Sequence, residues 1–200
     1  MQEIFDMVLI NNSENKMQRP FDDIYQETLL HLRQHDCGTY PFGDGNGLID
    51  LVSKLAPDRI LELGTALGYT ACCFAKAASA ALIDTVEMDS AHVQLARENI
   101  ARHGFKNRVT VYEGKFEETM PRLYNAYDLV FFDGFAPNLD ILIKLQERLR
   151  TGGYLICANL GLADAPARNQ LEREILNLSH WKIQPALENG GTRVAVKCVA

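Results

Sequence analysis

Two glycines and two acidic residues have the spacing of a nucleoside-binding turn. Gly64 and Gly68 follow a short apolar run, and Glu62 stands two residues before Gly64. Glycine permits a tight turn at Gly64 and leaves bare backbone for a ligand at Gly68. Glu87 ends the next apolar run, where a carboxylate can accept hydrogen bonds from both ribose hydroxyls. The spacing therefore predicts a site for a ligand that contains a ribose.

The glycine spacing also separates this turn from that of dinucleotide-binding proteins. The segment from Gly64 to Gly68 reads G-x-x-x-G, whereas the NAD and FAD fingerprint is G-x-G-x-x-G. This departure weighs against a dinucleotide. Met88, beside Glu87, is expected to pack on an adenine ring.

The other reactive side chains show no comparable pattern. The five histidines lack metal-ligand spacing, so surface or packing roles are expected for His31, His35, His92, His103 and His180. The five cysteines are odd in number and form no C-x-x-C pair, which argues against a disulfide framework or a zinc site and favours a reducing cytoplasm. No nucleophile elbow surrounds a serine, so a hydrolase is not indicated. We expect no bound metal.

The elements that must position the glycine turn alternate along the chain. Apolar runs predict strands over residues 59–63, 82–87, 109–112, 128–132 and 154–158. Helical spacing predicts helices over residues 69–80, 90–103, 116–123 and 139–149, with Ser90 as one cap. Strands that are apolar on both faces and alternate with helices indicate a parallel sheet covered on both sides.

The two ends of the chain depart from this alternation. Residues 21–35 and 44–55 are expected to be helices, the second capped by Asp44, so that residues 1–56 form a helical cap on a cofactor-binding sheet of residues 57–200. A helix over 166–178 precedes two alternating runs, 181–187 and 192–199, which Asn189-Gly190 joins as a hairpin. The prediction is one α/β domain over residues 1–200: a doubly wound, mainly parallel seven-stranded sheet with a C-terminal antiparallel hairpin.

The composition of the chain limits the classes of partner that it is expected to bind. The chain has 200 residues and a net charge of −6, from 20 Lys and Arg against 26 Asp and Glu. An acidic balance offers no broad surface for nucleic acid or an anionic membrane. No run approaches the roughly 18 apolar residues of a membrane span, and no leader pattern opens the chain. We expect a cytoplasmic protein without nucleic-acid or membrane partners.

Several segments, in this order, resemble the class I S-adenosylmethionine-dependent O-methyltransferases that include catechol and caffeoyl-CoA O-methyltransferases. They are residues 42–47, 62–70, Glu87, residues 113–116 and Asp133. The resemblance implies a Rossmann-like methyltransferase fold with S-adenosylmethionine as cofactor. It implies cofactor-binding roles for Tyr40, Phe42, Glu62, Gly64, Thr65, Gly68, Thr70, Glu87, Met88, Gly114, Lys115, Phe116 and Asp133.

The catalytic half of the resemblance is incomplete. Metal-dependent members hold a divalent ion with the fourth-strand acid and an Asp-Asn pair, and a lysine helps to deprotonate the acceptor. This chain supplies Asp133 and Asn159, but Ala158 replaces the second acid and Ala136 the lysine. One carboxylate and one amide are too few oxygen ligands for a hard cation. We therefore expect methyl transfer without the usual divalent ion, with Asp133 either accepting a proton or only binding the cofactor's amino group.

The acceptor stays open between several classes. O-methylation of a small molecule is the leading expectation, by a protein that the resemblance makes a possible homodimer. Residues 133–137, D-G-F-A-P, also resemble a domain that N-methylates a modified tRNA uridine, so an amine or a tRNA base is an alternative acceptor. A cofactor-binding partner protein whose catalytic half has decayed is another. Residues 40–47 are expected to fold over the methionine end of the cofactor.

Overall fold

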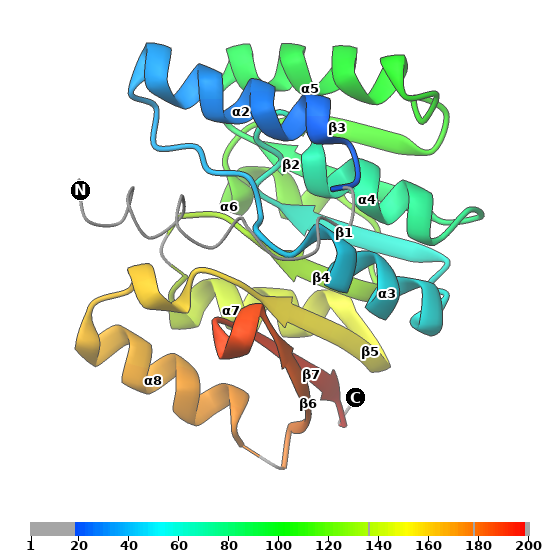
Figure 1. Ribbon diagram of the computed structural model, residues 1–200. Helices are drawn as coiled ribbons and strands as arrows, with labels where there is room; N and C mark the ends of the chain where they lie inside the picture. The colour runs from blue at the N-terminus through cyan, green and yellow to red at the C-terminus, as the bar shows by residue number, and fades with distance from the viewer. Residues whose placement is uncertain (1–18, 136, 178, 199–200) are drawn as a thin grey trace.

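The protein folds around one mainly parallel sheet. The computed structural model describes residues 19–135, 137–177 and 179–198 (Figure 1). Within these ranges the sheet has seven strands in the order β3-β2-β1-β4-β5-β7-β6. The strands are β1 (Arg59–Leu63), β2 (Leu82–Glu87), β3 (Val109–Glu113), β4 (Tyr127–Phe132), β5 (Leu149–Cys157), β6 (Trp181–Leu187) and β7 (Thr192–Lys197). In this sheet β7 runs antiparallel to both of its neighbours, β5 and β6, which confirms the expected parallel sheet with a terminal hairpin.

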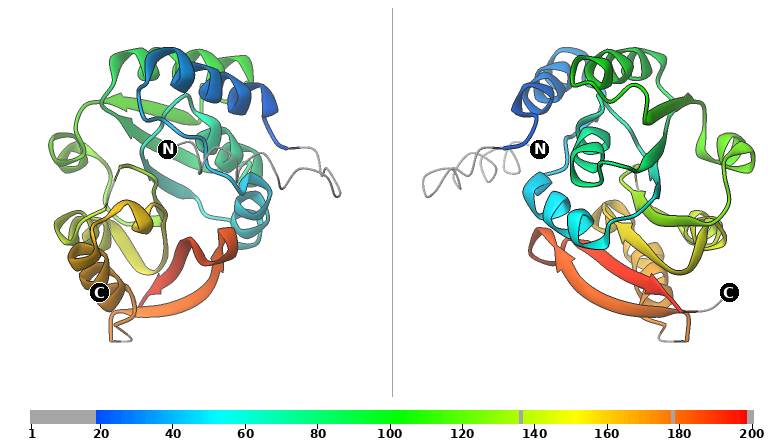
Figure 2. Two further views of the ribbon diagram at one scale, coloured as in Figure 1. Left: turned by 60° about the vertical axis from the view of Figure 1, so that its left-hand side comes forward. Right: turned by 90° about the vertical axis from the view of Figure 1, so that its right-hand side faces the viewer.

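Helices cover both faces of the sheet (Figure 2). They are α2 (Asp22–His35), α3 (Gly45–Leu55), α4 (Tyr69–Ala77), α5 (Ser90–Arg102), α6 (Phe116–Thr119), α7 (Leu139–Arg148) and α8 (Ala165–Ile175). Short 3₁₀ turns follow α6 (Met120–Arg122), β5 (Leu160–Leu162) and β6 (Glu188–Gly190). None of the helices in the described ranges is long and apolar enough to cross a membrane.

Alternating side chains give the sheet two buried faces. Along β4, Leu129 and Phe131 pack with α3, α4 and α5, whereas Val130 and Phe132 pack with α7 and α8. Successive residues of a strand point to opposite faces, so a continuous apolar run suits a strand that is covered on both sides.

The strand order reverses between β1 and β4. From β1 the chain moves outward through β2 and β3, then returns to place β4 on the other side of β1. Loops at the carboxyl ends of these strands diverge and leave a crevice, which is where open α/β sheets bind ligands.

The N-terminal helices are held to this framework by polar contacts. Arg102 of α5 pairs with Asp23 and Glu27 of α2 at 3.6 and 3.1 Å, so α2 lies along α5 (Figure 1). Asp44 caps α3, as predicted, by accepting the Gly47 N–H at 2.8 Å. The expected cap of α5 was wrong by one residue, because Asp89 rather than Ser90 accepts the backbone N–H groups of the first turn.

Most other differences from the sequence prediction concern element ends. The predicted helix over residues 116–123 divides into α6 and a 3₁₀ turn, because Pro121 has no N–H to continue an α-helix. The hairpin connection is four residues long, with Asn189 and Gly190 both at positive φ. The predicted helix end at Leu178 and strand end at Val199 lie outside the described residues, as do residues 1–18 of the expected cap.

Candidate active site

A cavity of about 540 Å³ opens at the strand reversal. It lies beyond the carboxyl ends of β1, β2, β4 and β5, where Gly64, Glu87, Asp133 and Asn159 line it. The loop between α2 and α3 lines the opposite wall with residues 37–43. The volume falls within the range of small-molecule sites, which is about 300–1,000 Å³.

The two glycines of the turn have different neighbours. Gly64 has φ +99°, and a Cβ there would lie 2.6 Å from the carbonyl oxygen of Asp133. Only glycine therefore lets the end of β1 pass the end of β4. Gly68 also has positive φ, but its bare face lies against Ala96 and Ile100 of α5. Gly68 is not among the described residues that line the cavity, and a Cβ there would meet α5 at 3.4 Å, an ordinary van der Waals contact. Its positive φ of +90° is therefore what favours glycine at this position.

Glu62 lies beneath the turn and does not line the cavity. It is fully buried and accepts hydrogen bonds from the hydroxyls of Thr70 and Thr85, the latter at 2.6 Å. Burial raises the pKa of Glu62 to about 7 against the opposing effect of the two hydroxyls, and the nearby Glu87 carboxylate raises it further. Thr70, which donates to Glu62, does line the cavity, so its side chain stands between the Glu62 carboxylate and that space.

Glu87 presents a fixed carboxylate to the cavity. Its Oε2 accepts the Ala66 N–H at 3.0 Å, and its Oε1 accepts the N–H groups of Met88 and Asp89 at 2.9 and 3.0 Å. A carboxylate has about four lone-pair positions, and these three bonds leave one on Oε2. The arrangement holds the acid in place and leaves it able to accept one further hydrogen bond.

Asp133 is the acid at the end of β4. The Asn159 amide donates to its Oδ1 at 3.0 Å and to the Gly134 carbonyl at 2.8 Å. Burial raises the pKa of Asp133 well above its usual range, and the Glu62 and Glu188 carboxylates add to this. The Asn159 hydrogen bond acts in the opposite direction. A raised pKa makes the ionised carboxylate a stronger base than an exposed one.

The loop over the cavity is anchored at two points. The Phe42 side chain is 5% exposed and packs edge-to-face on Phe131, with ring centroids 5.4 Å apart. The Gly43 N–H donates to Glu188 Oε1 at 3.1 Å, while Glu188 Oε2 accepts from Thr192 at 2.7 Å. The loop is thereby tied to the hairpin that ends the sheet.

The cavity combines exposed apolar side chains with negative charge. Tyr40, Met88, Phe135 and Leu162 line it and are each more than half exposed. Carboxylates also line it, and no Lys or Arg stands among its described lining residues. Such a site favours a cationic ligand and an apolar one over a polyanion.

The structure gathers most of the predicted site residues. Those that line the cavity are Tyr40, Phe42, Gly64, Thr65, Thr70, Glu87, Met88, Phe116 and Asp133; those that do not are Glu62, Gly68, Gly114 and Lys115. Gly114 lies beside Thr119, whose oxygen would be 2.8 Å from an added Cβ. The sequence did not single out Cys37, Gly38, Thr39, His92 or Glu188, which also line the cavity. They come from elements far apart in the sequence, and no local motif marks them.

The divalent-ion site of the metal-dependent enzymes does not fit these residues. Ala158 is buried at the end of β5 and offers no ligand atom. Asn159 turns its amide nitrogen, rather than its oxygen, toward Asp133. Both oxygens of the nearby Glu188 carboxylate already accept hydrogen bonds. Ala136, at the expected position of the lysine, lies outside the described residues.

Comparison with protein families gives a match at the same segment. Residues 61–160, half of the chain, match a family model described as a methyltransferase domain. The matched range contains the glycine turn, Glu87, Asp133 and Asn159.

Individual relatives agree with this match. Catechol O-methyltransferase B from Danio rerio is 32% identical over 141 residues, covering 65% of this chain and 53% of the relative. A tRNA1(Val) (adenine(37)-N6)-methyltransferase from Parabacteroides distasonis is 40% identical over 114 residues, which cover 57% of this chain and 46% of the relative. The chain thus spans about half the length of these curated relatives. The crystal structure of an O-methyltransferase from Bacillus cereus in complex with SAH superposes with a TM-score of 0.74 at 22% identity, over 98% of this chain and 96% of that one.

Proposed function

Because the chain belongs to the methyltransferase domain family, we propose that it is an S-adenosylmethionine-dependent O-methyltransferase acting on a small acceptor. The observation that carries this proposal is the Glu87 carboxylate, which three backbone N–H groups hold beside the Gly64 turn with one lone pair to spare. That is the geometry required to accept a hydrogen bond from a ribose hydroxyl at a strand reversal.

The residues on the cavity wall fit the parts of the cofactor. Glu87 accepts from the ribose, and Met88 and Phe116 offer apolar surface to the adenine. The carboxylate-rich lining, without Lys or Arg among its described residues, suits a sulfonium and an ammonium group. The loop of residues 37–43 covers the methionine end.

Asp133 is the catalytic residue of this proposal. S-adenosylmethionine supplies a methyl group that is already activated, so the protein must align an acceptor oxygen and remove its proton. The hydroxyl proton passes to the Asp133 carboxylate, a C–O bond forms, and the C–S bond breaks. Burial, which raises the pKa of Asp133, makes its carboxylate suited to accept that proton. Asn159 is a positioning residue, since it holds one carboxylate oxygen through its amide.

We infer that this reaction proceeds without a divalent ion at Asp133. The support is the missing ligand at Ala158 and the orientation of the Asn159 amide. The acceptor is a neutral or cationic molecule with an apolar body, because exposed Tyr40, Phe135 and Leu162 line the open side of the cavity. The lack of Lys and Arg among the described lining residues weighs against a tRNA acceptor, although one relative is named for tRNA methylation.

Single-turnover transfer from radiolabelled S-adenosylmethionine to a panel of phenols, amines and bulk tRNA tests the proposal. We expect methylated phenols, and Asp133→Asn is expected to slow transfer by about 10²–10⁴-fold while S-adenosylhomocysteine still binds. Transfer only to amines or tRNA would show that the acceptor is a nitrogen nucleophile and not the proposed hydroxyl group. Cofactor binding without transfer to any member would favour a decayed partner protein. Analytical ultracentrifugation tests the homodimer that the family resemblance implies.

A further inference from the structure

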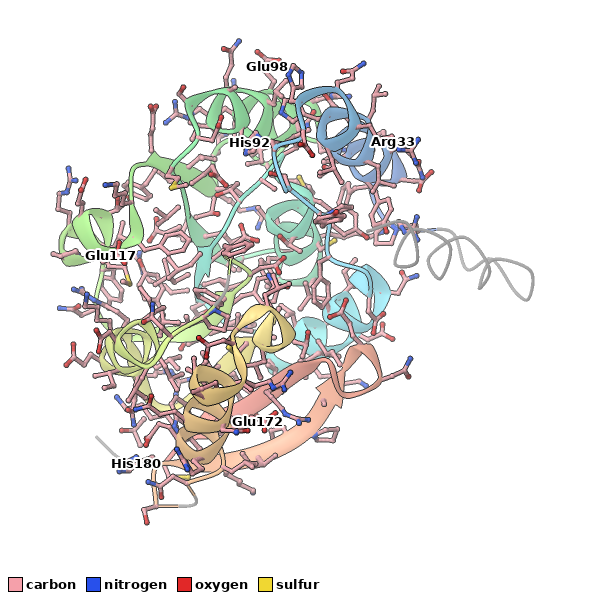
Figure 3. The ribbon with its side chains drawn as sticks, turned by 90° about the vertical axis from the view of Figure 1, so that its left-hand side faces the viewer. Arg33, His92, Glu98, Glu117, Glu172 and His180 are labelled. Carbon is pink, nitrogen blue, oxygen red and sulfur yellow. The ribbon has the colours of Figure 1, made fainter. Side chains whose placement is uncertain are left out.

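A cluster of nitrogen and sulfur ligands lies at the edge of the cavity. His31 is on α2, Cys37 follows the end of that helix, and His92 is in the first turn of α5. The ligand atoms of these three side chains all lie within 4.8 Å of one another. Figure 3 shows His92 on the side of α5 that faces α2. His31 and His92 lie on helices far apart in the sequence and show no metal-ligand spacing there, which is why surface or packing roles were expected for them.

Local structure brings the three side chains together. Asp36 ends α2 in the left-handed conformation, and its N–H donates to the Leu32 carbonyl at 2.8 Å. The chain reverses direction at this residue, so that Cys37 comes close to His31. Asp89 caps α5 and fixes the helical turn that carries His92. The rings of His31 and His92 meet edge-to-face with centroids 5.0 Å apart. The cluster therefore stands on two packed helices and one short turn.

We propose that His31, Cys37 and His92 form a binding site for a borderline-soft divalent metal of the Zn²⁺ class. Zn²⁺ takes imidazole nitrogen at about 2.0–2.1 Å and thiolate sulfur at about 2.3 Å, so tetrahedral ligand atoms lie roughly 3.4–3.8 Å apart. The ligand atoms lie within 4.8 Å of one another, so binding of the ion would require side-chain rotations that bring them closer. Three protein ligands leave a fourth position for water or for His35, whose ring centroid is 4.4 Å from that of His31.

The charges around the cluster favour a cation there. Glu87 Oε1 lies 4.0 Å from His92 Nδ1, and carboxylates near metal-bound histidines stabilise their orientation. Mg²⁺ does not suit this donor set, because it prefers oxygen ligands. The site is thus distinct in chemistry from Asp133 and Asn159.

A metal at this position would join the end of α2 to α5. Cys37 and His92 also line the cavity, so the ion would fix the loop of residues 37–43 against the wall that carries Glu87. Metal binding itself does not depend on the transfer reaction. Its failure and the failure of the proposed function are therefore separate results.

Titration of metal-depleted protein with Co²⁺ tests the site directly. We expect one tight Co²⁺ with tetrahedral d–d bands and a thiolate-to-cobalt charge-transfer band, both displaced by Zn²⁺. Cys37→Ser should abolish the charge-transfer band, whereas the exposed Cys198→Ser should leave it intact. His31→Gln should weaken binding by about tenfold or more, and His180→Gln, a histidine paired with Glu174 elsewhere, should not.

Thermal unfolding of the same variants provides the second measurement. Zn²⁺ should raise the Tm of the wild type and of Cys198→Ser but not that of Cys37→Ser. A cooperative unfolding transition of Cys37→Ser in the same measurement shows that this variant folds. A wild type without the charge-transfer band, or a band that persists in Cys37→Ser, would overturn the proposal. Co²⁺ binding by the His31→Gln variant as tight as that of the wild type would also overturn it.

Discussion

The side-chain amide of Asn159 donates one hydrogen bond to Asp133 Oδ1 and another to the carbonyl of Gly134. It reaches both groups because Asn159 adopts the left-handed conformation directly after β5, with φ 62°. The amide thus joins the ends of two neighbouring strands across the floor of the cavity. In a metal site its oxygen would face the ion, whereas here its nitrogen donates to the carboxylate that we propose as the base.

Removing the Asn159 amide should move the pH dependence of transfer. The hydrogen bond lowers the pKa of Asp133 against the effect of burial, so Asn159→Ala should raise that pKa further. The base is active when ionised, and the acidic limb of the kcat profile should therefore shift to higher pH. Rates measured across pH with saturating cofactor check this. An unshifted limb with only a lower plateau would mean that Asp133 is not the base.

Glu87→Gln should weaken cofactor binding. The amide retains the shape of the side chain but loses the negative charge and one acceptor, so charge-assisted hydrogen bonds are lost. We expect the Kd for S-adenosylhomocysteine to rise by about 10–100-fold, equal to about 1.4–2.8 kcal/mol. Calorimetry provides the measurement, with Glu98→Gln on the exposed face of α5 as the control. Unchanged affinity in a folded Glu87→Gln protein would place the ribose elsewhere.

Glu62 should make folding stability depend on pH. Its pKa is raised from 4.5 in the unfolded chain to about 7 in the folded protein. A raised carboxyl pKa favours the folded state below the unfolded value, and this contribution is lost as pH rises from about 4.5 to about 7. Across that window, wild type should lose up to about 3 kcal/mol of unfolding free energy that Glu62→Gln does not lose.

Chemical denaturation at several pH values measures this difference. The Thr70 and Thr85 hydroxyls can rotate to accept from a glutamine amide, so the variant is expected to fold. The exposed Glu147→Gln on α7 is the matched control and should follow the wild type. Parallel curves for wild type and Glu62→Gln would contradict the raised pKa.

The loop of residues 37–43 should become protected when the cofactor binds. It lines the cavity, but before Phe42 its residues are exposed or half-buried rather than buried. Hydrogen exchange with and without S-adenosylhomocysteine should show slower exchange over residues 40–47, the segment expected to fold over the cofactor. Glu188→Ala, which removes the acceptor of the Gly43 N–H, should speed exchange at Gly43 in the free protein. Protection confined to residues 62–70 would show that the loop is only a connector.

Added Mg²⁺ should not stimulate methyl transfer. The Ala158 side chain offers no ligand atom, and the Asn159 amide turns its nitrogen toward Asp133. Too few side-chain oxygens therefore remain beside Asp133 to bind Mg²⁺, which prefers oxygen ligands. We expect metal-depleted protein to change its rate by less than about twofold over a Mg²⁺ titration. The Cys37→Ser variant, treated in the same way, separates this result from any effect of a Zn²⁺-class ion. A large Mg²⁺ stimulation in both proteins would show that Asp133 recruits other oxygens.

Local sequence determined the sheet and the ligand-binding turn. Continuous apolar runs could only be strands covered on both sides, and the bounds of β1, β2 and β6 agree with the prediction residue for residue. The Asp44 cap and the positive φ of Gly64 also follow from local backbone geometry, whereas the close approach of Gly64 to Asp133 is a tertiary contact. Secondary structure and turns depend on such short-range interactions, so a single chain is enough to predict them.

Tertiary structure alone decided the wall of the cavity and the second cluster. Glu188 reaches Gly43 across 145 residues, and His31 meets His92 only because α2 packs on α5. It also decided that Glu62 supports the turn from beneath and that Gly68 faces a helix. Side chains converge through the packing of distant elements, and that packing is set by the shapes and buried surfaces of many residues together. No spacing within the sequence records it.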